Sequence, residues 1–211
     1  MKFSGLKEYA YHKIREKLIS NEIKPGERIW EEEIATELEI SRTPVREAIN
    51  RLVAEELVEN RPRKGVFAAE ISKEELRKML SVRTVLESLS VSQCCKLITD
   101  EEIDELKKLY ESYKKKMEKC EYEKASQLDS QIHRFIAKIS RNKRLETYIN
   151  DIQDIFAYAR PHNVKWTKEK INRSLEDHKK LIEAICNRDE NSAIKIVKED
   201  ILAMDDLLKN S

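Results

Sequence analysis

Apolar residues recur at intervals of three and four along most of the chain, which is the spacing of one buried face of an α-helix. In the first 70 residues this spacing predicts helices at 6–19, 31–38 and 42–55, with Ile34, Ala35 and Leu38 buried in the second. Two short apolar runs at 57–60 and 66–69 flank a charged turn, a pattern typical of a β-hairpin. Helix, helix, short turn, helix and hairpin is the element order of a winged helix-turn-helix.

The remainder of the chain, which contains no glycine after Gly65, keeps the helical spacing to its end. It predicts about six helices, near 73–98, 100–119, 121–140, 144–160, 167–187 and 190–209. Ser72 and Glu75 match a capping box at the start of the first of these. We therefore expect a mainly α protein with a winged helix-turn-helix domain at 1–71 and an all-α antiparallel helical bundle at 72–211.

Composition excludes several classes of protein. Three Gly and four Pro in 211 residues are too few for a turn-rich β-sandwich or barrel. No stretch approaches a run of 18 apolar residues, so we expect neither a membrane span nor a secretion signal. The four cysteines form no CxxC pair, which favours reduced thiols and a cytoplasmic location. The 41 basic residues nearly balance the 40 acidic ones, which excludes a strongly basic coating protein but permits a local basic surface.

The predicted third helix separates into an apolar and a polar face. The apolar face consists of Val45, Ala48, Ile49 and Leu52, and the polar face of Arg42, Thr43, Arg46 and Asn50. Arginine can donate two hydrogen bonds to guanine, and threonine can contact a phosphate or a thymine methyl group, so the polar face suits the major groove of DNA. An ordinary solvated helix face is the alternative, and the short helix before it and the basic hairpin after it favour the DNA-binding interpretation.

The ends of this helix and the hairpin turn add further candidates. Ser41 or Thr43 can cap the helix, and Pro44 is tolerated in its first turn because its missing N–H would be unpaired there. In the hairpin turn, Arg63 and Lys64 would reach phosphates or the minor groove, where Gly65 lets the backbone approach closely.

A group of possible metal ligands lies in the helical half. Asp129 and His133 are four residues apart and so project from one face of a helix, while His178 and Asp200 lie on two other predicted helices. Imidazole and carboxylate ligands converging from three helices of a bundle would suit a divalent metal. Spacing alone leaves open that these histidines are surface or packed residues.

The N-terminal motifs resemble those of the GntR family of bacterial transcriptional regulators. They are the segment from Ser41 to Ile49, the preceding segment from Ile23 to Ile29 and the wing at Gly65. The resemblance implies DNA contacts by Arg42, Thr43, Arg46 and Gly65, with Ser41 at the helix start. The chain departs from the family at Glu32, where some members carry a DNA-contacting Arg, and at Glu39 and Glu56, where the family often has Gly.

The second half resembles the FadR-type ligand-binding domain called FCD, and its six helices fit the VanR-like branch. Arg83 and Glu87, Asp129 and His133, and the segment from Asp177 to Ile185 match its motifs. The resemblance implies a divalent metal held by Asp129, His133, His178 and Asp200, where zinc is the ion expected in a purified sample and manganese, nickel or iron are alternatives. Asp200 stands where many members place a third histidine.

The resemblance also implies a small organic acid as effector, with Arg83 and Arg160 as its binding residues. Two carboxylate ligands would neutralise a divalent ion, so arginine would contribute more of the attraction for an anion. Each arginine could instead be a structural ion-pair partner, as Arg83 could be for Glu87 four residues later.

These observations predict a homodimeric, ligand-responsive transcriptional regulator, most often a repressor in this family, which binds a palindromic double-stranded DNA operator. A short reading helix covers only a few base pairs, so a two-fold dimer is needed for affinity and specificity. No catalytic residue is expected. The alternatives are a metal-dependent hydrolytic enzyme that uses the Asp129, His133, His178 and Asp200 cluster, and a regulator that has lost its metal through Asp200.

Overall fold

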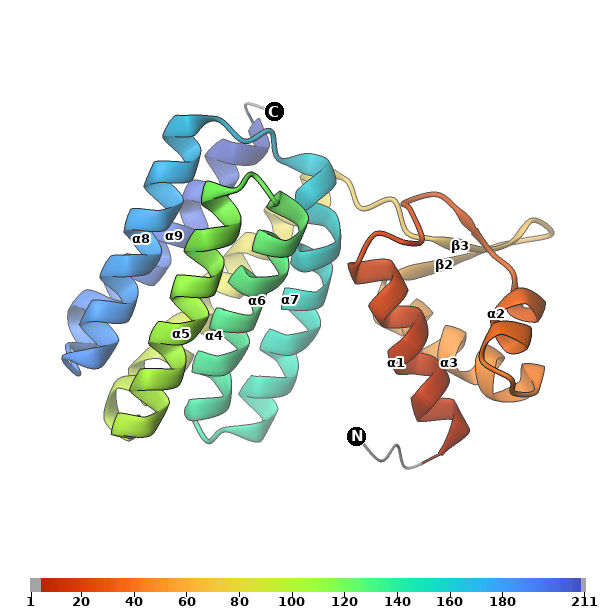
Figure 1. Cartoon of the computed structure of the whole chain (residues 1–211), viewed down its shortest axis with the longest axis horizontal. Helices are drawn as coiled ribbons and strands as arrows, with labels where there is room; N and C mark the ends of the chain where they lie inside the picture. Colours follow the sequence, from red (N-terminus) through yellow and green to blue (C-terminus); the bar gives the residue numbers. More distant parts are fainter. Residues whose placement is uncertain (1–4, 210–211) are drawn as a thin grey trace. The chain divides into compact units, whose positions relative to one another are not determined.

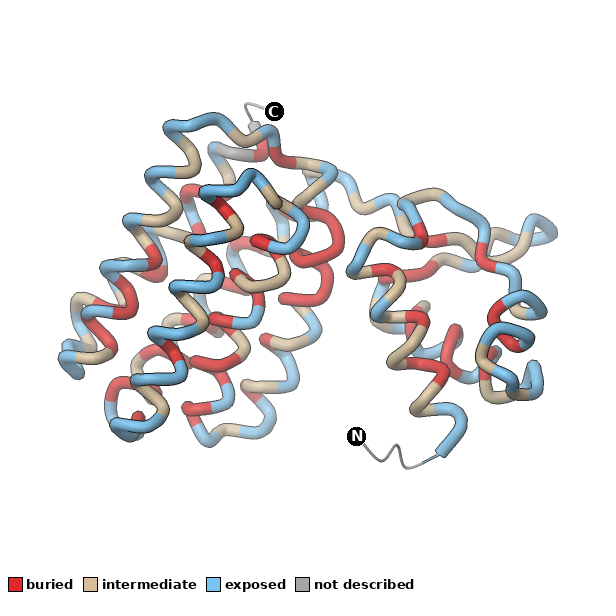
Figure 2. The backbone as a smooth tube through the Cα atoms, viewed as in Figure 1, coloured by how far each residue is buried: buried red, intermediate tan, exposed pale blue. Residues whose placement is uncertain are grey.

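The structure is a computed structural model that describes residues 5–209, without the side chains of residues 207 and 209. Within this range the chain divides into two compact units, one ending at Ile71 and the other starting at Ser72. Figure 1 shows the helices and strands of both units, and Figure 2 shows that the buried residues line the inner faces of the helices in each. The mainly α fold class predicted from the sequence is confirmed.

The first unit contains three helices, which are α1 (Leu6–Ile19), α2 (Glu31–Glu37) and α3 (Arg42–Ala54). Helix α3 packs against both α1 and α2. Its buried residues are the four predicted, Val45, Ala48, Ile49 and Leu52. In α2, Ile34 and Ala35 are buried as expected, but Leu38 is only half-buried because it already lies at the C-terminal cap of the helix.

A small antiparallel sheet completes this unit. Strands β2 (Val58–Arg61) and β3 (Gly65–Ala68) form the expected hairpin, with Arg61 opposite Gly65 at its tip. A third strand that the sequence did not suggest, β1 (Arg28–Ile29), pairs with the other edge of β3, so the strand order is β1-β3-β2. Two residues are too few to show the alternation of apolar and polar residues by which a strand is recognised.

Two glutamates end the helices of this unit in the left-handed backbone region. Glu39, after α2, has φ +55°, and Glu56, after α3, has φ +60°. The next residue in each case donates from its backbone N–H to a carbonyl in the last turn, Ile40 to Ala35 and Leu57 to Leu52. Glycine is the residue most often found at this type of helix end. Glu39 and Glu56 therefore keep the backbone geometry of the GntR pattern, and each lowers the stability of the fold by about 1–2 kcal/mol relative to glycine.

The second unit is a bundle of six helices: α4 (Lys73–Leu97), α5 (Asp100–Glu118), α6 (Tyr122–Ile139), α7 (Lys143–Asn163), α8 (Lys168–Cys186) and α9 (Glu190–Lys209). The capping box between Ser72 and Glu75 is present at the start of α4. Helix α7 continues to Asn163, beyond its expected end, with Pro161 inside its last turn. Among the described residues, no helix is long and apolar enough to cross a membrane.

Candidate functional site

The polar face of α3 is the first candidate site. The structure exposes its four predicted residues, Arg42, Thr43, Arg46 and Asn50, and also Ser41 at the helix start. Ser41 occupies the N-cap position with extended backbone, although its side chain makes no capping hydrogen bond. The wing-tip residues Arg63 and Lys64 are exposed in the turn between β2 and β3, so both sets of polar side chains are accessible to a ligand.

The reading-face arginines are paired within the chain. The single N–H of Arg46 Nε is shared between the two oxygens of the Glu31 carboxylate, at 3.2 Å and 3.1 Å, and Nη2 donates to one of them at 2.8 Å. Arg42 Nη2 lies 3.8 Å from the same carboxylate. Sequence reasoning did not foresee this contact, because the spacing within one helix does not show which residues of another helix it meets.

Arg28 is a further cation on this unit that sequence reasoning missed. Its guanidinium lies 3.7 Å from the centre of the Trp30 ring, in a cation–π arrangement. A side chain at Gly65 would stand 3.1 Å from that guanidinium, and the φ of +109° at Gly65 also favours glycine. The short strand β1 brings Arg28 to the wing, and no helical periodicity reveals that proximity.

The second candidate site lies inside the helical bundle. Asp129 and His133 on α6 and His178 on α8 are buried, and one possible ligand atom of each lies within 4.8 Å of the other two. Asp200 on α9 is partly buried, with its carboxylate oxygens 3.5 Å from His178 Nδ1 and 3.7 Å from His133 Nε2. The structure therefore brings together all four residues that the sequence suggested as metal ligands.

The contacts that Nδ1 of each histidine makes leave the other ring nitrogen, Nε2, directed at this centre. His178 Nδ1 is 2.9 Å from the carbonyl oxygen of Ser174, which can only accept, and His133 Nδ1 is 2.5 Å from a carboxylate oxygen of Glu87. A proton on each Nδ1 satisfies these contacts, so Nε2 is the nitrogen of each ring that could bind a metal ion. Oxygen partners at the second nitrogen are the usual support of metal-binding histidines, so these residues fit a divalent ion.

The charges of the site are strongly coupled. Burial alone would raise the pKa of the Asp129 carboxyl, but Arg160 and His178 hold it well below its usual value. Burial would lower the pKa of His178, whereas Asp200 and Asp129 raise it to about 9. A metal ion at His178 therefore has to displace a proton, so its affinity falls at lower pH.

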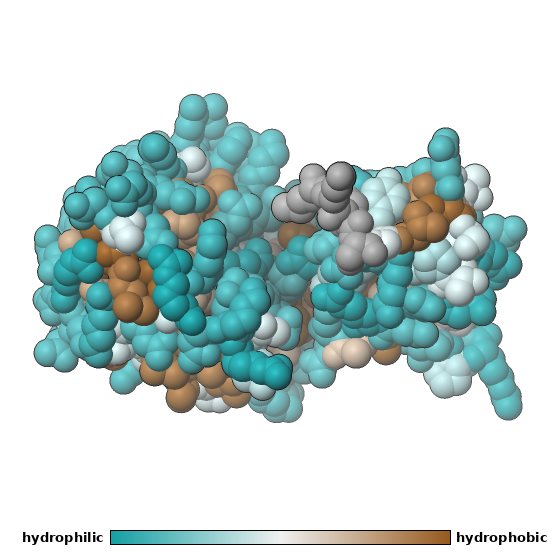
Figure 3. Space-filling view, turned by 90° about the horizontal axis from the view of Figure 1, so that it is seen from below, coloured by the Kyte–Doolittle hydropathy of each residue, from teal (hydrophilic) through white to brown (hydrophobic). Residues whose placement is uncertain are grey.

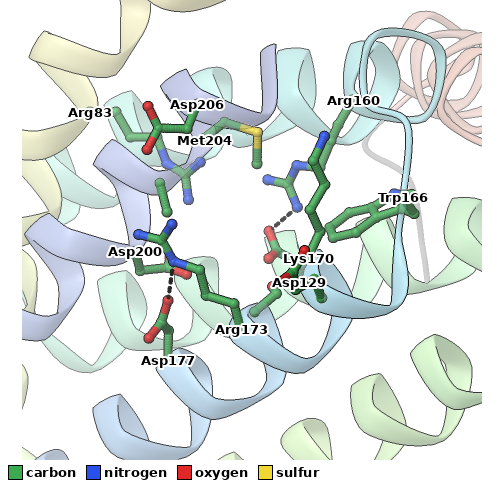
Figure 4. A pocket seen from close by; sticks show the side chains of 13 residues that line it. Arg83, Asp129, Arg160, Trp166, Lys170, Arg173, Asp177, Asp200, Met204 and Asp206 are labelled. Carbon is green, nitrogen blue, oxygen red and sulfur yellow. Dashed lines mark ion pairs between the residues drawn. The ribbon is translucent and has the colours of Figure 1, made fainter. Parts of the chain in front are cut away.

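A cavity of about 480 Å³ opens beside this centre, and Asp129 and Asp200 line it. Figure 4 shows Arg83 and Arg160 reaching into the cavity from opposite sides. Both arginines are buried, and Arg160 forms an ion pair with Asp129. The Nε and Nη2 atoms of Arg160 are buried without a hydrogen-bond partner among the described residues. A buried guanidinium with unpaired donors favours an anionic ligand.

Arg83 makes the ion pair with Glu87 that the sequence suggested, and it also lines the cavity. Its Nε donates to Glu87 Oε1 at 2.6 Å, and the amide of Gln153 donates to the same oxygen at 2.6 Å. Burial alone would raise the pKa of Glu87, but Arg83 and His133 lower it to about 2. Glu87 therefore links Arg83 to His133, one of the candidate metal ligands. The part of Gln153 was not foreseen, because it lies 66 positions away on α7.

Comparisons with known proteins match both units to families. Residues 6–68 match the bacterial regulatory proteins of the gntR family, and residues 78–203 match the FCD domain. The Nta operon transcriptional regulator of Aminobacter aminovorans is 30% identical over 85% of this chain and 83% of its own length. The gluconate operon transcriptional repressor of Bacillus licheniformis is 23% identical over 89% of this chain and 78% of its own length.

Solved structures share the fold of the whole chain. Escherichia coli McbR/YncC has a TM-score of 0.85 at 22% identity and covers 98% of both chains. A putative GntR regulator from Rhodococcus sp. RHA1 has a TM-score of 0.83 at 17% identity, over 97% of this chain and 98% of its own. The matched families and relatives are regulators, so a hydrolytic enzyme has no support. This chain belongs to the GntR family of bacterial transcriptional regulators and carries an FCD domain.

Proposed function

We propose that this regulator represses its target genes by binding a palindromic operator as a homodimer, and that a small carboxylate bound beside a metal ion in the FCD domain controls this binding. The observation that carries the proposal is the buried Arg160, whose unpaired Nε and Nη2 adjoin a cavity next to Asp129, His133 and His178. The relative named as a gluconate operon repressor supports repression as the outcome. We also propose that this chain belongs to the FadR-type subfamily and to its VanR-like branch.

In the proposed complex with DNA, the exposed polar residues of α3 and of the wing have separate roles. Arg42 and Arg46 would read guanine, and Thr43 would contact a phosphate or a thymine methyl group. Ser41 and Asn50 flank them on the same face, and the wing would position the domain on the backbone. The wing residues in this role are Arg63, Lys64 and Gly65.

The proposed metal ligands are Asp129, His133, His178 and Asp200. Zinc is the ion expected in a purified sample, and manganese, nickel or iron are alternatives. A bound divalent cation would supply a Lewis-acidic position for an effector carboxylate oxygen. The chain's own contribution is to hold both Nε2 atoms in place through Glu87 and the Ser174 carbonyl. Arg160 would bind the same effector from the side of α7.

The proposed dimer interface is an apolar stripe on the surface of α4. Val82, Val85 and Leu89 lie at helical spacing on one face and are 52%, 69% and 46% exposed. In Figure 3, brown hydrophobic patches interrupt the hydrophilic surface of the helical unit. A contiguous exposed apolar face marks an interaction surface, and a two-fold operator requires two copies of the reading helix, so we assign a second copy of this chain to it.

The experiment that tests this proposal measures operator affinity in the presence of acetate, malonate, malate or citrate, with and without EDTA. An effective acid should change the affinity of the metal-loaded protein about 5–150-fold, the usual range of allosteric coupling. The response should disappear in Arg160→Lys, which keeps the charge but loses the planar fork, while DNA binding itself persists. An unchanged response in Arg160→Lys would contradict the assigned role.

A further inference from the structure

A carboxylate on α2 contacts both arginines of the proposed reading face. The Glu31 carboxylate accepts from Nε and Nη2 of Arg46 and lies 3.8 Å from Arg42 Nη2. These arginines are four positions apart on α3, whereas Glu31 belongs to the preceding helix. One acidic side chain therefore links the two helices at the surface that the proposed function places against DNA.

Glu31 is the more firmly held partner of this pair. Its side chain is 19% exposed, against 59% for Arg46. It is the first residue of α2, where the helix dipole favours a negative charge, and the buried Ile34 and Ala35 anchor the helix on the core of the unit. The position of Glu31 is therefore fixed by the fold, and the flexible arginine takes its orientation from the carboxylate.

The contact engages only one edge of the Arg46 guanidinium. Nε and one N–H of Nη2 point at Glu31, which leaves Nη1 and the other N–H of Nη2 for a second partner. This remaining edge presents two parallel donors, the arrangement that pairs with guanine O6 and N7. An arginine held in this way also has less rotamer freedom to lose when it binds.

We propose that Glu31 is a specificity-determining positioning residue, which orients Arg46, and with it Arg42, for guanine in the major groove. The inference rests on the proposed function, because it requires that α3 reads DNA. Glu31 acts by fixing the donor edge of the arginine. It therefore raises the difference between specific and nonspecific binding.

The pair is a suitable target for substitution because it lies at the surface. Exposed ion pairs contribute little to stability, so Glu31→Gln should fold normally. Glu32→Gln is a matched control, since Glu32 is exposed in the same first turn and the change removes the same charge. Arg46→Lys is the second background, because lysine keeps the charge but cannot present a two-donor edge while contacting Glu31.

The test uses the full chain and two DNA probes: a duplex that the wild-type protein selects from a random pool, and the same duplex scrambled. The ratio of the two affinities should fall about tenfold in Glu31→Gln, close to the discrimination of one bidentate contact, and stay unchanged in Glu32→Gln. The loss should come from the selected duplex, with affinity for the scrambled duplex equal to that of Glu32→Gln. In the Arg46→Lys background, Glu31→Gln should change the ratio no further.

Three results would overturn the inference. An unchanged ratio in Glu31→Gln would make the contact an ordinary surface ion pair. A rise in affinity for the selected duplex would show that Glu31 masks the arginines. Equal losses on both duplexes together with a lower unfolding temperature would show a structural role only. If the wild-type protein selects no sequence, the proposed function fails as well, which distinguishes that case from these three.

Discussion

The buried carboxylate of Glu87 gives the most informative test of how the FCD domain is held together. It is 3% exposed, accepts hydrogen bonds from Arg83 and Gln153 at 2.6 Å each, and lies 2.5 Å from His133 Nδ1 in an ion pair. Glu87→Gln removes the negative charge with little change in volume. It leaves the guanidinium of Arg83 without its adjacent counter-charge and sets a donor NH₂ group opposite the donors of its neighbours.

The expected cost follows from the burial of this ion pair. Removal of one partner from a buried pair destabilises a protein by about 3–5 kcal/mol, because the other charge stays buried. Asp129 and Asp200 also favour the charged form of Arg83, so we expect the lower end of this range, about 3 kcal/mol. At about 2–4 °C per kcal/mol for a chain of this size, the midpoint of thermal unfolding should fall by about 6–12 °C.

The assay can report the helical unit alone, because the two tryptophans of the chain lie one in each unit. In a Trp30→Phe background, the fluorescence of Trp166 follows unfolding of the FCD domain in urea. The double variant Arg83→Met with Glu87→Gln should lose less stability than the sum of the single variants, with a coupling of about 2 kcal/mol. A cost of Glu87→Gln below about 1 kcal/mol, or additivity within about 0.5 kcal/mol, would refute this reasoning.

Three further predictions concern the metal site, the dimer and a helix end. Zinc at about 100 times its dissociation constant should stabilise the wild-type protein by about 2.7 kcal/mol, and His133→Ala should abolish that gain. If the proposed dimer forms through the apolar stripe of α4, Val85→Lys should sediment as a monomer at micromolar concentration where the wild-type protein sediments as a dimer, because it places a charge in that stripe. Glu56→Gly should stabilise the N-terminal unit by about 1 kcal/mol in urea unfolding followed by Trp30, because it relieves the φ of +60°.

Each of these changes has a matched control. His162→Ala removes an exposed histidine outside the cluster and should leave the zinc effect intact. Leu6→Lys alters an exposed apolar residue of the other unit and should leave the dimer intact. Glu47→Gly, within α3, should destabilise the N-terminal unit by about 1 kcal/mol, whereas Glu56→Gly should stabilise it. Equal behaviour of a variant and its control would contradict the corresponding explanation.

The helical pattern of the sequence predicts most of this fold because burial and periodicity coincide in it. The apolar face of α3 is buried at the four expected positions, and the six helices of the bundle lie close to their expected bounds. Strand β1 was missed, because its two residues are paired by β3 rather than by any local preference.

The candidate sites were predictable to the extent that their residues share a helix or a motif. Asp129 and His133 stand four positions apart, and the structure brings them together with His178 and Asp200 as expected. Contacts between distant positions, such as Gln153 with Glu87, depend on how the helices pack, which spacing along one helix does not encode. The pairing of Arg46 with Glu31 was missed for the same reason.

The central claim is that α3 inserts its arginine-bearing face into the major groove, and selection of duplexes from a random pool tests it most directly. The wild-type protein should enrich a palindrome with half-sites about one or two helical turns apart. Arg46→Ala and Arg42→Ala should each bind that duplex about 1–3 kcal/mol more weakly. Failure to enrich any sequence at low salt, or undiminished affinity of both variants for the enriched duplex, would contradict the claim.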